Sequence, residues 1–194
     1  MSRLLISAAL VAAATLAPTA AFAQAIPAAV VAVVDLDKVT TDCTACKTAS
    51  AALRSQVTAL GTRETQLAAP LKTEQQAIQK AIDALAGKAP DAALEARIKA
   101  FQTKQQSGAA ELQRQQQQLQ RNQAFIQQQI QAKLGPIYQQ VMTRRGANLL
   151  MEVGATLATA ATVDVTADVV TALNAALPSL RTTAPPPAQQ PQGR

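Results

Sequence analysis

Two long helical patterns, joined by a short break, constrain this chain more than any other feature. Large apolar residues recur three, four or seven positions apart from about residue 45 to 86, and again from about 91 to 145. The break between them, GKAPD, holds the glycine, proline and aspartate that end one helix and begin the next. Matching stripes on adjacent helices predict an antiparallel coiled-coil hairpin over residues 45–147.

Both arms contain residues that disturb a helix. Pro70 lies inside the first arm, and Gly135 and Pro136 lie near the end of the second. Proline removes a backbone donor and clashes with the preceding turn, so a kink is expected at such a position. Pro70, Gly135 and Pro136 are therefore the hinge candidates.

The segment before the hairpin predicts a strand. Residues 28–35, AAVVAVVD, form a short Val-rich run that is typical of a buried strand. The segment 24–44 is thus expected to supply the first strand of a β-body and a connector to the helices.

The segment after the hairpin, 148–177, is expected to supply the rest of that body. NLLMEV and ATLATAAT, residues 148–153 and 155–162, predict two strands of a β-hairpin around Gly154. Thr166 is expected to cap a final helix. Residues 178–194 are rich in Pro and Gln and predict a disordered tail.

The expected fold class is α+β, mostly α, with the hairpin projecting from a small β-body. Three short strands and one helix make only a marginal core. Oligomerisation is therefore expected to complete the body.

The first 23 residues predict a cleaved signal peptide. Arg3 gives a positive start, an apolar run follows, and Ala21-Phe22-Ala23 is an A-x-A cleavage site. The apolar run is shorter than the ~20 residues that a bilayer span needs. An exported, periplasmic protein is expected.

Composition argues against catalysis. The chain has no His, so it cannot build a Ser-His-Asp triad, a Cys-His pair or an imidazole metal site. Aromatic residues make up 2% of the chain, which is little bulk for a compact enzyme core. No catalytic residue, metal or cofactor is predicted.

Residues 63–145, the greater part of the hairpin, carry a charge of +6, which equals the net charge of the whole chain. Between residues 63 and 145 there are 12 Lys or Arg against 6 Asp or Glu. A solvated coiled-coil surface is one explanation, and attraction to acidic partners or anionic headgroups is the other. Nucleic acid is not expected in an exported protein, and aromatic side chains that could stack on bases are few. The residues predicted to form a diffuse binding surface are Lys72, Lys80, Lys88, Arg97, Lys99 and Lys104.

The only two cysteines, Cys43 and Cys46, form a C-x-x-C motif. A strand-like run before them and a helical run after them resemble the order of a thioredoxin-type site, but the chain lacks the βαβ pattern of that scaffold. A structural disulfide in an oxidising compartment is favoured. A metal site or crosslink between chains, free thiols and a dithiol oxidoreductase stay open as alternatives.

The order of these elements resembles the Skp/OmpH family of periplasmic chaperones over about residues 29–177. The resemblance rests on AVVAVVDLDKV, on the Gln/Lys-rich hairpin, and on NLLMEVGATLATAATVDVTADVVTALN. In the last of these, Asp164 to Val169, DVTADV, matches the D-[IV]-T-x-x-[IV] start of the family's final helix. Paired cysteines before the hairpin are a departure from the family.

The resemblance implies a homotrimer whose three hairpins project like tentacles around a cavity. It implies an ATP-independent holdase that binds unfolded outer-membrane proteins. Some members bind lipopolysaccharide, but the pattern of residues for that site is not clear in this sequence. Anionic lipid or lipopolysaccharide headgroups therefore stay open as partners. The alternative function is a structural coiled-coil adaptor of the cell envelope or of an export machine.

Overall fold

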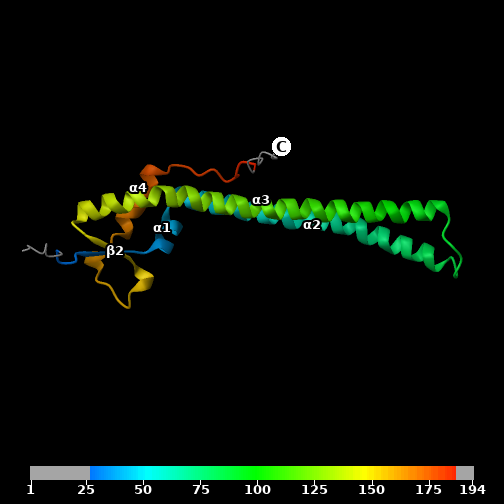
Figure 1. Cartoon of the computed structure of the whole chain (residues 1–194), viewed down its shortest axis with the longest axis horizontal. Helices are drawn as coiled ribbons and strands as arrows, with labels where there is room; N and C mark the ends of the chain where they lie inside the picture. Colours follow the sequence, from blue (N-terminus) through cyan, green and yellow to red (C-terminus); the bar gives the residue numbers. More distant parts are fainter. Residues whose placement is uncertain (1–26, 187–194) are drawn as a thin grey trace, which may run out of the picture.

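A long helical hairpin projects from a small body in this structure, a computed structural model that describes residues 27–186 (Figure 1). The predicted signal peptide, residues 1–23, and the end of the tail, 187–194, lie outside the described residues. The mostly helical α+β class expected from the sequence is confirmed.

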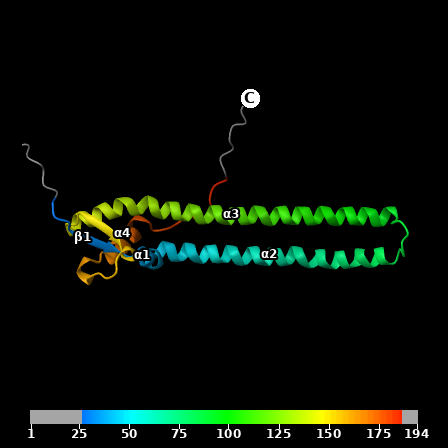
Figure 2. The ribbon, with the colours of Figure 1, turned by 60° about the horizontal axis from the view of Figure 1, so that its bottom comes forward.

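The hairpin consists of α2, Thr44–Asp83, and α3, Ala92–Arg145, which lie side by side along most of their length (Figure 2). At ~1.5 Å per residue, the longer arm extends roughly 80 Å. Asp91 caps α3 by accepting a hydrogen bond of 2.8 Å from the N–H of Leu94, and Gly87 takes a positive φ of 91° in the turn. The predicted hairpin is therefore confirmed, with its turn at the predicted glycine and aspartate.

A two-stranded parallel sheet forms the centre of the body. β1, Val31–Val34, pairs with β2, Leu149–Glu152, in the register Val31–Leu149 to Val34–Glu152. The strands are parallel because the chain leaves β1 along one arm and returns along the other before it enters β2. Asn148 secures the entry of β2, since its Oδ1 accepts from the N–H of Val30 at 2.7 Å.

Three helices, α1 (Leu36–Asp42), α3 and α4 (Thr166–Ala176), share the core of the body with this sheet. α1 and α4 pack with the base of the hairpin. Val39, Val141, Val169 and Leu173, from α1, α3 and α4, are fully buried. The core of the body thus unites segments from both ends of the chain.

The connector predicted within 24–44 is largely helical. Asp35 accepts a hydrogen bond from the N–H of Lys38 at 2.8 Å and so starts α1 directly after β1. A cap followed by an apolar residue, Val39, on the inner face was enough to form two helical turns.

The predicted β-hairpin around Gly154 is wrong. Beyond β2 the chain forms two 3-10 turns, Val153–Ala155 and Ala161–Val163, rather than a second strand over 155–162. Among residues 27–186, a single bridge, Val33 to Asp164, extends the sheet at its other edge. The alanines and threonines of ATLATAAT have little apolar surface to bury, and Leu157 is fully exposed.

The predicted cap of the last helix is also wrong in detail. Thr166 is the first residue of α4, and its hydroxyl accepts from the N–H of Asp35 at 2.9 Å. The carboxylate of Asp164 instead accepts from the N–H of Thr166 at 2.8 Å. Thr166 is buried and joins the end of β1 to α4.

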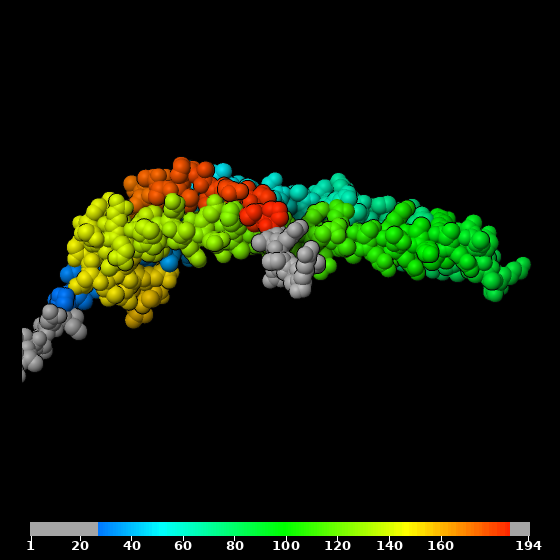
Figure 3. Space-filling model, turned by 45° about the horizontal axis from the view of Figure 1, so that its top comes forward, coloured from blue at the N-terminus to red at the C-terminus, as the bar shows by residue number. Residues whose placement is uncertain are grey.

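The tail was predicted to be disordered from residue 178, and this is wrong for residues 178–186. They continue from α4 and run along the hairpin toward its tip (Figures 1 and 3). Hydrogen bonds between side chains of α2 and α3 and the backbone of Arg181, Thr182 and Ala184 hold them there. Polar partners on the hairpin, together with the packing of Leu180 against the core, overrode the composition of this segment.

Candidate functional site

The distal half of the hairpin carries the six basic residues singled out in the sequence. All six side chains are exposed, on both arms and on the turn that joins them. They are Lys72, Lys80, Lys88, Arg97, Lys99 and Lys104. No buried pocket within residues 27–186 gathers them, so they form a spread surface rather than a point site.

One of the six is paired with an acid. Arg97 donates two hydrogen bonds to the carboxylate of Glu74, at 2.6 and 3.2 Å. This interaction across the arms lowers the pKa of Glu74 and offsets the charge of Arg97. Within residues 27–186 the five lysines make no ion pair, and they supply the free positive charge of this surface.

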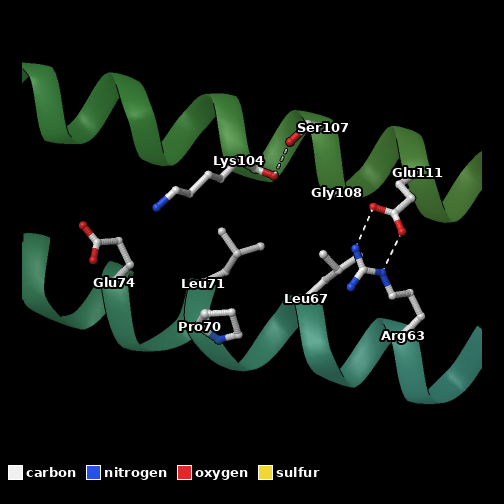
Figure 4. A pocket seen from close by; sticks show the side chains of 9 residues that line it. All are labelled: Arg63, Leu67, Pro70, Leu71, Glu74, Lys104, Ser107, Gly108 and Glu111. Atoms are coloured by element: carbon white, nitrogen blue, oxygen red, sulfur yellow. Dashed lines mark hydrogen bonds and ion pairs between the residues drawn. The ribbon is translucent and has the colours of Figure 1, made fainter.

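A shallow groove lies between the two arms halfway along the hairpin (Figure 4). Gly108 of α3 is buried opposite Leu67 of α2, and a Cβ at Gly108 would lie 3.9 Å from the Leu67 side chain. At one end Arg63 donates two hydrogen bonds to Glu111, at 2.6 and 3.0 Å. The groove is lined by Arg63, Leu67, Pro70, Leu71, Glu74, Lys104, Ser107, Gly108 and Glu111.

The chemistry of this groove is that of a contact surface. The hydrogen bonds from Arg63 lower the pKa of Glu111, so its carboxylate is charged and is not poised as an acid or base. In residues 27–186 no three His, Cys, Asp or Glu side chains gather closely enough to hold a metal ion. Apolar and charged groups side by side suit adaptable binding of another chain.

The hinge candidates lie within continuous helices. α2 runs through Pro70, and α3 runs through Gly135 and Pro136. All three residues are exposed. A Cβ at Gly135 would meet no atom within 4 Å, so packing does not require glycine there. Their role as hinges stays a prediction.

Cys43 and Cys46 form a disulfide at the junction of α1 and α2. Cys43 ends α1 and caps α2, where its Sγ accepts from the N–H of Cys46 at 3.2 Å. Cys43 is fully buried and Cys46 is 4% exposed, so both belong to the core of the body. A helix, α1, precedes the motif, in place of the strand and loop of a thioredoxin-type site.

The sequence prediction missed a row of side-chain amides in the half of the hairpin nearer the body. This amide row consists of Gln56 on α2 and Gln118, Asn122 and Gln129 on α3, and it faces the tail. Asn122 is 4% exposed and donates to Gln56 Oε1 at 2.8 Å, which links the two arms. Asn122 could have been found from the sequence, because it is a polar residue in the apolar stripe between Leu119 and Ile126. Nothing in the sequence marked the three glutamines among their many neighbours.

None of the helices within residues 27–186 combines the length and hydropathy of a membrane span.

Comparisons with known proteins agree with this architecture. The sequence matches the family described as "Outer membrane protein (OmpH-like)" over residues 30–173. Among curated proteins, none matches the sequence. The fold is similar to the crystal structure of an OmpH-like protein from Caulobacter crescentus CB15, which was proposed to be an outer membrane chaperone. The TM-score is 0.69 at 20% identity, over 86% of this chain and 96% of that one. Since the family match spans most of the chain, from β1 through the hairpin into α4, this protein belongs to the OmpH-like family.

Proposed function

We propose that the protein is an ATP-independent periplasmic holdase chaperone for unfolded outer-membrane β-barrel proteins. It binds them in a cavity between the hairpins of a homotrimer and prevents their aggregation. The observation that carries this proposal is the long hairpin itself, which projects from a small body and bears an exposed basic surface and a shallow amphipathic groove. Membership of the OmpH-like family supports it.

The features of the hairpin fit weak binding of many partners. Such binding needs surfaces that combine apolar contact with polar groups and that form no single deep pocket. The five unpaired lysines would attract acidic unfolded barrels, or anionic lipid or lipopolysaccharide headgroups near the membrane.

The body offers surface for association with other copies. Val30, Leu149 and Leu157 are large apolar residues at 49, 43 and 108% exposure, and all three lie in or beside the sheet or in the loop after it. A two-stranded sheet is small for an independent core. The exposure of these residues supports the trimer in the proposal, in which contacts between copies would bury them.

The test is the solution mass of the mature protein, measured by light scattering, alone and after mixing with a urea-diluted outer-membrane barrel. Without the barrel, the measured mass should be three times that of one chain. With the barrel, a soluble complex of both proteins is expected. Several unrelated unfolded barrels should be kept soluble in the same assay.

A monomer, or a trimer that leaves the barrel to precipitate, would overturn this proposal. A protein that fails with every barrel but binds one envelope protein tightly would instead be the structural adaptor.

A further inference from the structure

Five hydrogen bonds join residues 178–186 of the tail to the hairpin, and all five involve the backbone of these residues. Gln129 both donates to the carbonyl of Arg181 at 2.9 Å and accepts from its N–H at 3.1 Å. Gln56 donates to the carbonyl of Thr182 at 3.3 Å. Asn122 accepts from the N–H of Ala184 at 2.9 Å, and Gln118 donates to its carbonyl at 3.4 Å. The partners on the hairpin are the four members of the amide row.

This pattern matches the way one β-strand recognises another. The amide of Gln129 pairs with both backbone groups of one residue, as a neighbouring strand would. Leu180, Thr182 and Ala184 are half-buried while Arg181 and Thr183 are exposed, so the tail alternates like a strand. Backbone hydrogen bonds give affinity in such recognition, and side chains add specificity. In the tail, Leu180 packs against the core and the Arg181 guanidinium lies 5.7 Å from the centre of the Phe125 ring.

The amide row is organised by bonds of its own. Gln118 donates to Asn122 Oδ1 at 2.7 Å, and Asn122 donates to Gln56 Oε1 at 2.8 Å. Arg121 donates to Gln118 Oε1 and so turns the amide nitrogen of Gln118 toward the tail. These bonds lie within the hairpin, so the row is preorganised for a backbone ligand.

We propose that the amide row is a binding site for an extended segment of unfolded polypeptide, and that the protein's own tail occupies it as an intramolecular competitor. This proposal rests on the proposed chaperone function and adds a site to it. Bonds to backbone groups are available on every unfolded chain, which suits a protein that binds many sequences. A tethered tail is present at a high effective concentration and weakens the binding of any other segment.

Proline variants of the full-length protein keep the tail but remove backbone N–H groups from it, so they test the hydrogen bonds of the tail. Arg181→Pro with Ala184→Pro removes the two N–H groups that donate to the row, and also the Arg181 guanidinium over the Phe125 ring. The N-methylated probes described below keep that side chain and so test the N–H groups alone. Ser179→Pro with Thr183→Pro is the matched control, because both residues are exposed and their N–H groups make no hydrogen bond in residues 27–186. The probe is a fluorescent peptide with the sequence of residues 178–186, PSLRTTAPP, and its affinity is measured by anisotropy.

The Arg181→Pro/Ala184→Pro variant should bind the probe roughly tenfold more tightly than the wild type or the control variant, since two hydrogen bonds of the competitor are lost. Adding Gln129→Met should abolish this gain, and Gln128→Met, at the exposed neighbouring residue, should not. A probe N-methylated at its Arg and Ala should fail to bind, whereas one methylated at its second Thr should bind. Equal affinities for all three proteins would overturn the proposal.

The assay with unfolded outer-membrane barrels distinguishes failure of the amide-row proposal from failure of the chaperone proposal. If the probe affinities are equal but unfolded barrels stay soluble, the amide row is only a structural clasp for the tail and the chaperone function stands. If the barrels also precipitate, both proposals fail. The helical content of each variant is checked by circular dichroism.

Discussion

Leu173 shows how much of the body depends on single side chains. It is fully buried on α4 and belongs to the core that includes residues of α1 and α3. Leu173→Ala should lower the free energy of unfolding in urea by about 2–5 kcal/mol, because it removes buried surface and leaves a cavity. Val170→Ala, at a half-buried residue of the same helix, should cost less. Equal losses would mean that the core does not centre on Leu173.

Glu111 gives a prediction about pH. Its hydrogen bonds from Arg63 hold its folded-state pKa below the usual value, so the pair stabilises the fold above the carboxyl's unfolded pKa. That contribution is lost as the pH falls through the folded pKa. Glu111→Gln should therefore lower Tm at neutral pH, and its difference from the wild type should shrink in acid. The effect will be modest because both side chains are partly exposed, at 41 and 30%.

The control for this variant is Glu64→Gln. Glu64 is an exposed carboxylate on α2 and forms no ion pair within residues 27–186. Its loss should leave Tm nearly unchanged at both pH values. A Glu111→Gln difference that grew in acid would contradict a stabilising role of the Arg63–Glu111 pair at neutral pH.

At the scale of elements, the disulfide fixes the junction of α1 and α2. Replacing Cys43 and Cys46 together with Ala removes this crosslink from the unfolded chain, and for so short a loop the cost is ~2 kcal/mol. Urea unfolding with and without a reductant measures it, and the Ala variant should not respond to the reductant. Retained suppression of barrel aggregation is also expected, since the sulfurs are buried in the body. Loss of that activity would instead point to a redox function.

Replacement of glycine by alanine should have opposite effects on stability at two positions, one inside α3 and one at its C-cap. Gly135 is in the interior of α3 with open space around it, so Gly135→Ala should stabilise the protein by about 1 kcal/mol. Gly146 ends α3 with a φ of 65°, so Gly146→Ala should destabilise it by a similar amount. Thermal unfolding of both variants tests this. If Gly135 is a hinge, Gly135→Ala should also slow the binding of unfolded barrels, and an unchanged rate would remove it from the hinge candidates.

At the scale of the whole molecule, charge is expected to govern encounter with partners. Changing Lys72, Lys80, Lys88, Lys99 and Lys104 to Gln removes the unpaired positive charge of the distal hairpin. Association with an acidic unfolded barrel, followed by stopped flow at low salt, should slow about tenfold or more. The difference should vanish at ~1 M salt, where charges are screened within a few ångströms.

An equal loss of charge near the body is the matched control. Lys38, Lys47, Arg54, Lys133 and Arg144 are also exposed and form no ion pair within residues 27–186. Their change to Gln should slow association much less. Equal slowing by both sets would show that net charge, rather than its place on the hairpin, governs the rate.

The sequence alone determined the helical hairpin, its turn at Gly87 and Asp91, and the first strand of the body. Helices are predictable because their hydrogen bonds, caps and apolar stripes all lie within a few residues of one another. The six basic residues were singled out by the excess of positive charge in this segment, and all six are exposed.

Only the tertiary structure decided what depends on distant partners. Val31 pairs with Leu149, and Asp35 bonds Thr166, across more than a hundred residues, so neither the parallel sheet nor the true role of Thr166 was visible locally. Residues 155–162 had the composition of a strand but no partner to pair with among the described residues, 27–186. The tail had the composition of a disordered segment, yet four amides brought together by the packing of α2 on α3 supply the hydrogen bonds that order it.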